Sequence, residues 1–335
     1  MRLFLLCPGR GSYGKAQLGT YQGPSAVLDQ LDAFRAGLGR PTLREMDAAD
    51  RHGARFHVAG ENASILTFGA TAYDIEALAP NKSEVVAVGG NSMGWYSALY
   101  AAGALDLSEA ARLIETMGQY QAKNVIGGQV LYPTVDTQWR PDAQLSAAVD
   151  AALETEDVHL SIRLGGTAVL AGTRGATKGL LASLPKLERG KRSYPVQLPL
   201  HSAFHTPLMS PTAERARAEL ADLALSGPAI PLIDGRGAVF HPWASPQEIF
   251  AWTLGAQVDD TYDFSATVQA GVGQFAPDAI VLPGPGDTLG ASVAQALIEI
   301  GWRGLRDKAD FAEAQKADVP LVISMARAEQ RALVV

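Results

Sequence analysis

The chain has 335 residues, of which 47% are apolar and 19% are charged, and its formal net charge is −7. This length and apolar content allow a sizeable core and roughly two domains. The acidic balance argues against a nucleic-acid-binding protein, because phosphate contacts require a concentrated basic surface. Cys7 is the single cysteine, which excludes an intramolecular disulfide and a cysteine-based metal site.

The N-terminal segment MRLFLLCPGRG reaches proline and glycine too early for a signal peptide. No stretch of the sequence approaches 18 uninterrupted apolar residues, the length expected of a membrane-spanning helix. We therefore expect a cytoplasmic protein without a membrane segment.

The first part of the chain alternates strand-like and helix-like segments. Residues 3–7 (LFLLC) and 84–88 (EVVAV) are typical of buried strands, and residues 63–78 (ASILTFGATAYDIEAL) are typical of a helix between them. This alternation predicts a largely parallel sheet covered by helices.

A second helix is predicted over residues 107–121 (LSEAARLIETMGQYQ). Ser108 is the expected N-cap residue of this helix. Asp106 and Glu109 carry negative charge near its N-terminus, where the helix dipole favours it.

The pattern changes near residue 127, from which six segments predict strand, helix, strand, strand, helix and strand. This order is ferredoxin-like. Buried-strand character returns at 229–235 and 278–286. We therefore expect an α/β fold in which residues 1–126 and 201–335 form a large α/β-hydrolase-like domain with a mostly parallel sheet, and residues 127–200 form an inserted ferredoxin-like (βαββαβ) subdomain. The six segments are 129–136, 141–156, 158–164, 167–172, 173–184 and 191–200.

The stretch VGGNSMGW at residues 88–95 places Ser92 between glycines, directly behind a predicted strand. A Gly-x-Ser-x-Gly between a buried strand and a helix is a nucleophile elbow, whose glycines allow a sharp turn that lifts the serine oxygen above the sheet. A plain strand-to-helix turn is the alternative, because 34 glycines make this spacing frequent. A nucleophilic serine also needs a base.

The candidates for that base are the six histidines. His201 and His205 lie in LPLHSAFHTPLM, at the predicted exit of the inserted subdomain, in a segment that leads into a helix. Either of them could serve Ser92, and a purely structural role for both is the alternative. The other four stand in polar or loop-like contexts with no supporting pattern: His52, His57, His159 and His241.

Five segments carry a family resemblance: CPGRGSYG at 7–14, GGNSMGW at 89–95, SAFHTPLM at 202–209, GAQVDD at 255–260 and VLPGPGDTLGASV at 281–293. In this order they resemble the FPGQGSQ opening, the GHSxGE elbow, the AFHSxxM segment, a glutamine-bearing stretch and the EIGPGxxLxxL motif of one family. That family comprises the malonyl-CoA:acyl-carrier-protein transacylases and the acyltransferase domains of polyketide synthases. Order and spacing match over nearly the whole chain.

The resemblance implies transfer of an acyl group from CoA to the phosphopantetheine thiol of an acyl carrier protein, in fatty-acid or polyketide biosynthesis. It implies no bound cofactor, no metal, no nucleic-acid partner and a monomer. Ser92 would attack the thioester and His205 would take and later return a proton. The backbone carbonyl of Gln257 would orient His205, and the amides of Arg10 and Met93 would form the oxyanion hole. Ping-pong kinetics would follow.

The expected substrate-binding residues are Met117, Asn91, Trp95 and Phe204. Met117 stands where malonyl-specific members carry the arginine that pairs with the malonyl carboxylate, which predicts a neutral acyl group. Arg10 replaces a glutamine of the first motif and offers an alternative cation for a carboxylate. Asn91 replaces the histidine before the nucleophile, and Trp95 adds apolar bulk at the end of the elbow. Phe204 belongs to an AFH motif, a form commonly associated with malonyl units.

Two other functions remain open. A hydrolase would clear acyl groups from carrier proteins by using water as the second nucleophile, and an inactive paralogue would only bind a carrier. A true α/β-hydrolase is disfavoured, because its histidine would lie near the C-terminus and none follows His241. His201 lies outside the matching motif and is interpreted as a bystander. Lys191 and Arg192, in the basic stretch ERGKRSY, are candidate residues for carrier docking.

Overall fold

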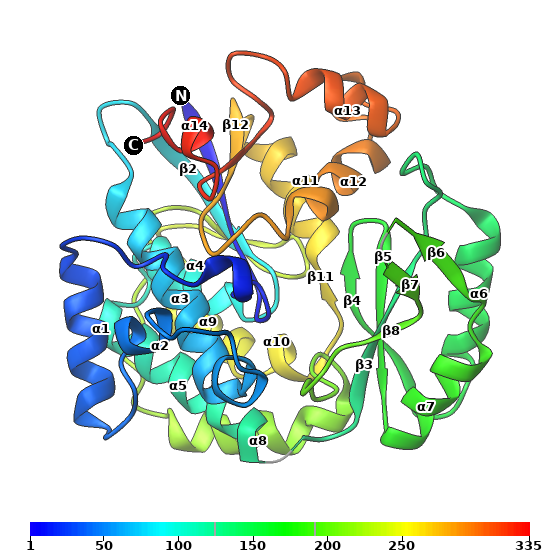
Figure 1. Cartoon of the computed structure of the whole chain (residues 1–335), viewed down its shortest axis with the longest axis horizontal. Coiled ribbons are helices and arrows are strands. Elements are labelled where there is room, and N and C mark those ends of the chain that lie inside the picture. The colour runs from blue at the N-terminus through cyan, green and yellow to red at the C-terminus, as the bar shows by residue number, and fades with distance from the viewer. Residues whose placement is uncertain (124, 191) are drawn as a thin grey trace.

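The computed structural model describes residues 1–123, 125–190 and 192–335 and shows an α/β fold built on two main sheets (Figure 1). The larger sheet has six strands in the described part of the chain, and neighbouring strands run parallel except for the antiparallel pair at one edge. This confirms the expected fold class. Across the sheet its strands are β10 (Val239–Phe240), β9 (Leu232–Ile233), β2 (Glu84–Gly90), β1 (Arg2–Cys7), β12 (Ala279–Leu282) and β13 (Val322–Ser324).

Strand β1 lies inside the sheet, between β2 and β12. Residues 3–7 are all fully or almost fully buried, as expected of a parallel strand that is covered on both faces. The strand ends at Cys7, whose carbonyl oxygen accepts a hydrogen bond from the Asn91 amide at 3.0 Å. This contact joins the ends of β1 and β2, next to the predicted elbow.

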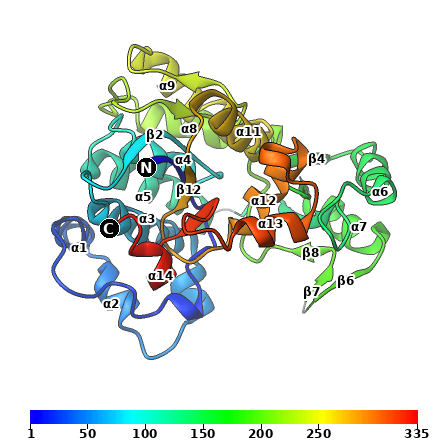
Figure 2. The same ribbon diagram turned by 90° about the horizontal axis from the view of Figure 1, so that it is seen from above.

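Helices cover both faces of the large sheet (Figure 2). Helix α5 begins at Leu107, and the Asp106 carboxylate accepts a hydrogen bond from the Glu109 amide at 2.8 Å. Asp106 is therefore the capping residue, and the prediction of Ser108 was wrong because the helix begins two residues earlier than that prediction required. The α-helices of the large unit are α1 (Ala26–Gly37), α2 (Leu43–Asp47), α3 (Gly60–Ala77), α4 (Gly94–Ala101), α5 (Leu107–Lys123), α8 (Ser210–Glu219), α9 (Pro246–Thr253), α10 (Ala256–Asp259), α11 (Phe264–Phe275), α12 (Gly290–Glu299), α13 (Lys308–Ala314) and α14 (Ala328–Arg331).

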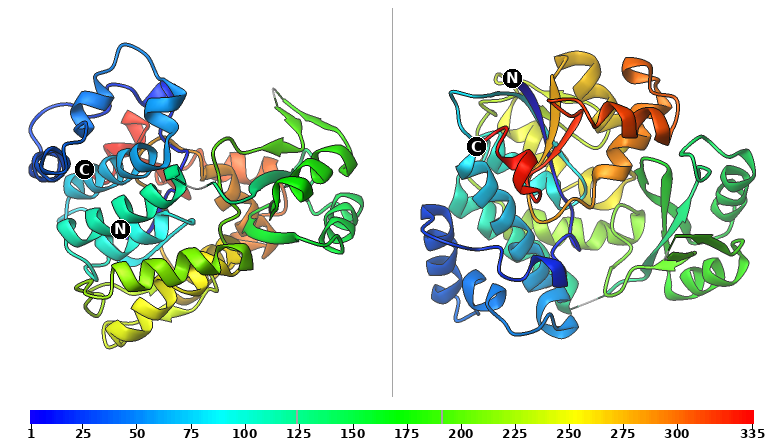
Figure 3. Two further views of the ribbon diagram at one scale, coloured as in Figure 1. Left: turned by 90° about the horizontal axis from the view of Figure 1, so that it is seen from below. Right: turned by 45° about the horizontal axis from the view of Figure 1, so that its top comes forward.

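The smaller sheet stands beside the large unit with two helices against it (Figure 3). Its own four strands have the order β4-β5-β3-β8, which is the ferredoxin-like arrangement, and β11 of the later chain extends the sheet at the β4 edge. Because β11 comes from the large unit, the division of the chain at 127 and 200 stays a prediction. The elements are β3 (Gly128–Pro133), α6 (Ala143–Leu153), β4 (Val158–Leu164), β5 (Thr167–Gly172), α7 (Arg174–Ser183), β8 (Val196–Gln197) and β11 (Tyr262–Asp263).

The last predicted strand of the subdomain, 191–200, is not continuous. Its described residues form two short strands, and the first of them pairs antiparallel with β6 instead of joining the small sheet. Pro195 lies between the two strands and has no N–H to donate, which explains the break. The hairpin consists of β6 (Leu187–Arg189) and β7 (Arg192–Tyr194), and the short helices elsewhere are η1 (Lys15–Gln17), η2 (Ala54–Val58), η3 (Pro207–Met209) and η4 (Trp302–Gly304).

Within the described ranges, none of the helices is both long and apolar enough to cross a bilayer.

Candidate active site

Ser92 lies in a tight turn between β2 and α4. Its backbone has φ = 54°, in the left-handed region. A Cβ added at Gly90 would lie 2.2 Å from the carbonyl oxygen of Gly94, and a Cβ added at Gly94 would lie 2.2 Å from the carbonyl oxygen of Cys7. Only glycine fits at both places. The turn is therefore a nucleophile elbow in its geometry, as the spacing of the glycines predicted.

Ser92 and His205 are hydrogen-bonded: Ser92 Oγ lies 2.7 Å from His205 Nε2. His205 Nδ1 lies 2.7 Å from the backbone oxygen of Gln257, which can only accept, so Nδ1 carries the proton and Nε2 is free to accept one from serine. Burial lowers the pKa of His205 to about 4, so the ring is neutral at neutral pH. A neutral imidazole in this tautomer is the state that a general base requires.

The side chain of Gln257 also contributes to the site, and no sequence pattern indicated this. Gln257 Nε2 donates to the backbone oxygen of Ser92 at 3.1 Å, and Tyr96 Oη donates to Gln257 Oε1 at 2.8 Å. Gln257 therefore touches the serine through its side chain and the histidine through its backbone. No signal in the sequence marked Tyr96, because its role depends on a partner 161 positions away.

Two backbone amides near Ser92 are free. Among residues 1–123, 125–190 and 192–335, neither the Arg10 amide nor the Met93 amide donates a hydrogen bond within the protein. Both residues line the same cavity as Ser92. Unpaired N–H groups beside a nucleophile are the donors that stabilise a developing oxyanion, so these amides are available for the predicted role.

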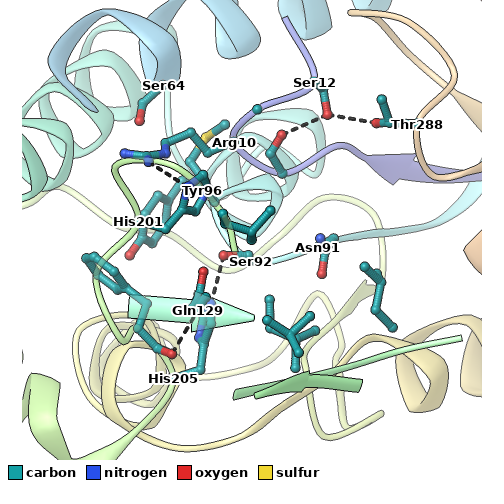
Figure 4. A pocket seen from close by; sticks show the side chains of 18 of the residues that line it. Arg10, Ser12, Ser64, Asn91, Ser92, Tyr96, Gln129, His201, His205 and Thr288 are labelled. Carbon is teal, nitrogen blue, oxygen red and sulfur yellow. Dashed lines mark hydrogen bonds between the residues drawn. The ribbon is translucent and has the colours of Figure 1, made fainter. Parts of the chain in front are cut away.

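The cavity around Ser92 has a volume of about 230 Å³ (Figure 4). About half of the residues that line it have apolar side chains, and most of these come from α5, from the small sheet and from the segment before α8. Three predicted substrate-binding residues are brought together there: Met117, Asn91 and Phe204. The cavity thus lies between the two sheets and suits an acyl chain better than a highly polar ligand.

Trp95 is not among the residues that line the cavity. Its ring is fully buried, packs against Phe240 and Trp252, and donates from Nε1 to Thr253 Oγ1 at 2.9 Å. The predicted contact with substrate is therefore corrected to a core position. The turn that lifts Ser92 toward the cavity directs the residue three positions later into the core.

His201 was interpreted as a bystander, but it lines the cavity and lies against Arg10. Its Nδ1 is 3.0 Å from Arg10 Nη2, and the same Arg10 nitrogen donates to the carbonyl oxygen of Leu200. Burial and the nearby Arg10 charge lower the pKa of His201 to about 3, so it stays neutral. The sequence could not show this contact, because it joins residues 191 positions apart.

A groove of about 460 Å³ adjoins the cavity and shares Leu198 and His201 with it. Arg174 and Lys178 of α7 line this groove and have no ion-pair partner among the described residues. The predicted docking residue Lys191 lies outside the described residues. Arg192 is exposed on the β6–β7 hairpin and does not line the groove.

The elbow serine, the neutral histidine held by a backbone carbonyl and the two free amides together define a serine–histidine site able to carry an acyl ester. No group of three or more histidine, cysteine or acidic side chains in the described part of the chain is arranged to hold a metal ion. No protein-family model matches the sequence.

The chain is similar in sequence to curated proteins over somewhat less than half of its length. It is 31% identical over 146 residues to the malonyl CoA-acyl carrier protein transacylase of Escherichia coli (strain K12), which is 43% of this chain and 46% of the relative. It is 32% identical over 145 residues to the mycoketide-CoA synthase of Mycobacterium tuberculosis, which is 43% of this chain and 3% of that protein. The match therefore spans about half the length of the transacylase.

Solved structures share the fold over the whole chain. The acyl-carrier-protein S-malonyltransferase of Burkholderia pseudomallei 1710b has a TM-score of 0.75 at 21% identity, and 99% of each chain is covered. A malonyl-transacylase in complex with its type II PKS acyl-carrier protein has a TM-score of 0.70 at 20% identity, with 89% of this chain and 93% of that chain covered. The chain is therefore similar to malonyl-CoA:acyl-carrier-protein transacylases in sequence over somewhat less than half of its length, and in fold over almost all of it.

Proposed function

We propose that the protein transfers an acyl group from CoA to the phosphopantetheine thiol of an acyl carrier protein through an ester on Ser92. The observation that carries the proposal is the 2.7 Å contact between Ser92 Oγ and His205 Nε2 beside a largely apolar cavity. The names of the relatives support the choice of CoA and carrier protein as donor and acceptor.

In the first half-reaction, Ser92 Oγ attacks the thioester carbonyl while His205 Nε2 takes the serine proton. The carbonyl oxygen becomes an oxyanion, which the amides of Arg10 and Met93 stabilise. The carbon–sulfur bond then breaks, and the CoA thiolate leaves with the proton that His205 holds. The acyl group remains as an ester on Ser92.

In the second half-reaction, the carrier thiol gives its proton to His205 and its sulfur attacks the ester carbonyl. The same amides hold the oxyanion, and Ser92 leaves with the proton from His205. Free enzyme and an acylated carrier are the products. Because CoA leaves before the carrier reacts, we expect ping-pong kinetics.

Two residues that line the cavity, Met117 and Arg10, favour acyl groups of different charge. Met117 is buried and lines the cavity, so α5 offers no cation to an acyl carboxylate at this position. This is the basis of the predicted neutral acyl group. Arg10 lines the same cavity and carries the opposite preference.

The first test is the mass of the intact protein after brief incubation with acetyl-CoA, malonyl-CoA or a medium-chain acyl-CoA. We expect wild type to gain the mass of an acyl group from at least one donor and Ser92→Ala to gain none. Ser97→Ala is the matched control, because Ser97 is a buried serine of α4 that does not line the cavity. Absence of an ester from every donor would contradict the proposal.

The second test separates transfer from hydrolysis. The acylated protein is freed of CoA and divided between buffer and buffer with holo-carrier protein. We expect the ester to decay much faster with the carrier, and the carrier to gain the acyl mass. Equal decay in both samples, with free acid as the product, would assign the protein to the hydrolases.

A further inference from the structure

Residues 198–201, which we call the partition segment, lie between the acyl cavity and the groove that adjoins it. The first and last residues of this segment, Leu198 and His201, line both, and the two residues between them line only the groove. Arg10, from the loop after β1, lines only the cavity. A ligand that moves from the groove to Ser92 must therefore pass the partition segment.

Arg10 holds the middle of the partition segment. Arg10 Nη2 donates to the Leu200 carbonyl oxygen and lies 3.0 Å from His201 Nδ1, and Figure 4 shows Arg10 beside His201 near Ser92. In the described part of the chain, Arg10 is the only residue whose hydrogen bonds tie residues 199–201 to anything outside the segment. One side chain thus joins the loop after β1 to the partition segment.

The partition segment has a backbone conformation that needs such a hold. Leu200 has φ = 56°, in the left-handed region that a leucine seldom adopts, and its side chain is half-exposed. This conformation persists only where neighbours fix it. At one end of the segment the Leu198 amide donates to the Gln129 carbonyl oxygen of β3 at 2.9 Å. At Leu200 itself, the hold comes from Arg10.

The contact between Arg10 and His201 can break without any movement of the backbone. His201 Nδ1 lies 3.0 Å from Arg10 Nη2, which can only donate, and 2.9 Å from the Pro199 carbonyl oxygen, which can only accept. Burial and the Arg10 charge lower the pKa of His201 to about 3, so the ring is neutral and this nitrogen serves one partner at a time. With its proton on Nε2 the ring accepts from Arg10, and with its proton on Nδ1 it donates to Pro199 and releases Arg10.

A pantetheine arm can replace the acceptors that Arg10 loses when this contact breaks. Arg10 remains charged at neutral pH, because burial lowers its pKa only to about 10, and its Nη1 is buried without a hydrogen-bond partner among the described residues. Pantetheine carries two amide carbonyl groups as acceptors, and Leu200 offers it an apolar contact in the groove. A water molecule provides much less of either, so the arm favours the open state more strongly than water does.

We propose that Arg10 and His201 form a latch on the partition segment, which stays closed over the Ser92 ester and excludes water until the pantetheine arm of the carrier opens it. This inference rests on the proposed acyl transfer. His201 is a positioning residue, because it touches Arg10 and not the reacting atoms. The latch determines whether water or the carrier thiol attacks the ester, and it therefore separates a transferase from a hydrolase.

Hydrolysis would follow the route of the second half-reaction. Water gives a proton to His205 while its oxygen attacks the ester carbonyl, and the amides of Arg10 and Met93 hold the oxyanion. The bond to Ser92 Oγ then breaks, Ser92 takes the proton from His205, and the free acid leaves. A latch that opens too readily should therefore shorten the lifetime of the ester in buffer.

That lifetime is measured by intact mass after the acylated protein is freed of CoA. We expect His201→Ala to shorten it about 10-fold, the factor of one lost hydrogen bond to a charged group, and to lower the ratio of transfer to hydrolysis equally when holo-carrier protein is present. His201→Asn, whose Oδ1 can accept from Arg10, should recover most of the lifetime. The matched control is His241→Ala, because His241 lines neither the cavity nor the groove.

A double-mutant cycle shows whether His201 acts through Arg10. Arg10→Ala keeps the backbone amide and removes the donor of the latch. If both residues act through one contact, the double variant Arg10→Ala/His201→Ala should lose its ester no faster than Arg10→Ala alone. An ester lifetime in His201→Ala equal to that of wild type, or additive effects in the double variant, would overturn the inference.

Hydrogen exchange measures the latch in a protein that carries no ester. The Ala203 amide donates to the Ile126 carbonyl oxygen at 2.7 Å, so its exchange reports opening just beyond the partition segment. We expect peptides over residues 196–203 to exchange faster in His201→Ala than in wild type, and peptides of the large sheet to be unchanged. Absence of a Ser92 ester together with this local change would reject the proposed function alone. Unchanged exchange over 196–203 would reject the latch even where the ester forms.

Discussion

Ser92 and His205 share an uncommon backbone conformation. Their φ angles are 54° and 60°, although neither is a glycine. A non-glycine residue in this region costs on the order of 1 kcal/mol and persists only where its surroundings fix it. Here hydrogen bonds fix both backbones. Gln257 Nε2 donates to the Ser92 carbonyl oxygen, and the His205 amide donates to the Val258 carbonyl oxygen at 2.8 Å. The two reacting side chains are thus aimed by neighbours that do not react.

Tyr96→Phe tests this positioning. The change removes the phenol that donates to Gln257 Oε1 and leaves a buried amide oxygen without its partner. We expect the acylation rate to fall about 10-fold, the order expected for one lost buried hydrogen bond, with little change in KM. The control is Tyr100→Phe on the same helix, because the Tyr100 hydroxyl has no hydrogen-bond partner in the described part of the chain.

The pH dependence distinguishes positioning from a loss of structure. Acylation needs neutral His205, so activity is present above its pKa of about 4 and is lost as the pH falls through that value. The Gln257 carbonyl raises this pKa by accepting from Nδ1, because the bond favours the protonated ring. A loosened Gln257 should therefore move the acid limb of the rate profile to lower pH. An unmoved limb together with an unchanged rate would show that Tyr96 has no positioning role.

At the scale of elements, the regular segments were predictable and the contacts between them were not. β1, α3, β2 and α5 were located from their hydrophobic periodicity to within a few residues, because burial sets that pattern. The strand after α7 was misjudged because Pro195 interrupts it. Ser92, His205 and Gln257 were found from motifs. The Arg10–His201 contact and the inward turn of Trp95 depend on how distant segments meet, which no local pattern records.

The elbow itself can be tested with Gly94→Ala. The new Cβ would press on the carbonyl oxygen of Cys7 at 2.2 Å, so β1 and α4 must separate. We expect a loss of about 1–3 kcal/mol in the free energy of unfolding and a clear drop in the acylation rate. The control is Gly179→Ala, an exposed glycine of α7 with no atom within 4 Å of the new Cβ, which should stabilise by roughly 0.5–1 kcal/mol. Urea unfolding measures the stability of each variant, and intact mass measures its rate of ester formation. Equal stabilities and equal rates for the two variants would refute the steric account.

At the scale of the whole molecule, the two sheets contribute different parts of one candidate site. The large sheet positions the serine, the small sheet closes the acyl cavity, and helix α7 with the segment after β8 lines the groove that adjoins it. The chain is acidic overall, with a net charge of −7, yet this groove presents the unpaired cations Arg174 and Lys178. Positive charge in this groove would attract a phosphate-bearing or acidic partner, although the protein as a whole is negatively charged.

Arg174→Glu combined with Lys178→Glu should therefore raise KM for the carrier protein and leave ester formation from CoA thioesters at short reaction times much less affected. The charge-reversal control is Lys82→Glu, which lies exposed before β2, at the opposite end of that strand from the elbow. Steady-state transfer is measured over a range of carrier concentrations at low and at high salt, because the effect should shrink as salt screens the charges. Carrier kinetics that match those of the control would exclude the groove as the docking route.

Cys7 has a chemical consequence for the proposed acyl transfer. It ends β1 directly beside the elbow, but its side chain is fully buried and does not line the acyl cavity. Burial raises the pKa of its thiol, so the sulfur stays protonated and is a poor nucleophile. A thiolate near an acyl-serine would compete for the acyl group: its sulfur would attack the ester carbonyl, the bond to the serine oxygen would break, and a cysteine thioester would form. Because its single cysteine is buried, the protein presents no thiol of its own to take the acyl group from Ser92. In the proposed reaction the accepting thiol must therefore come from the partner.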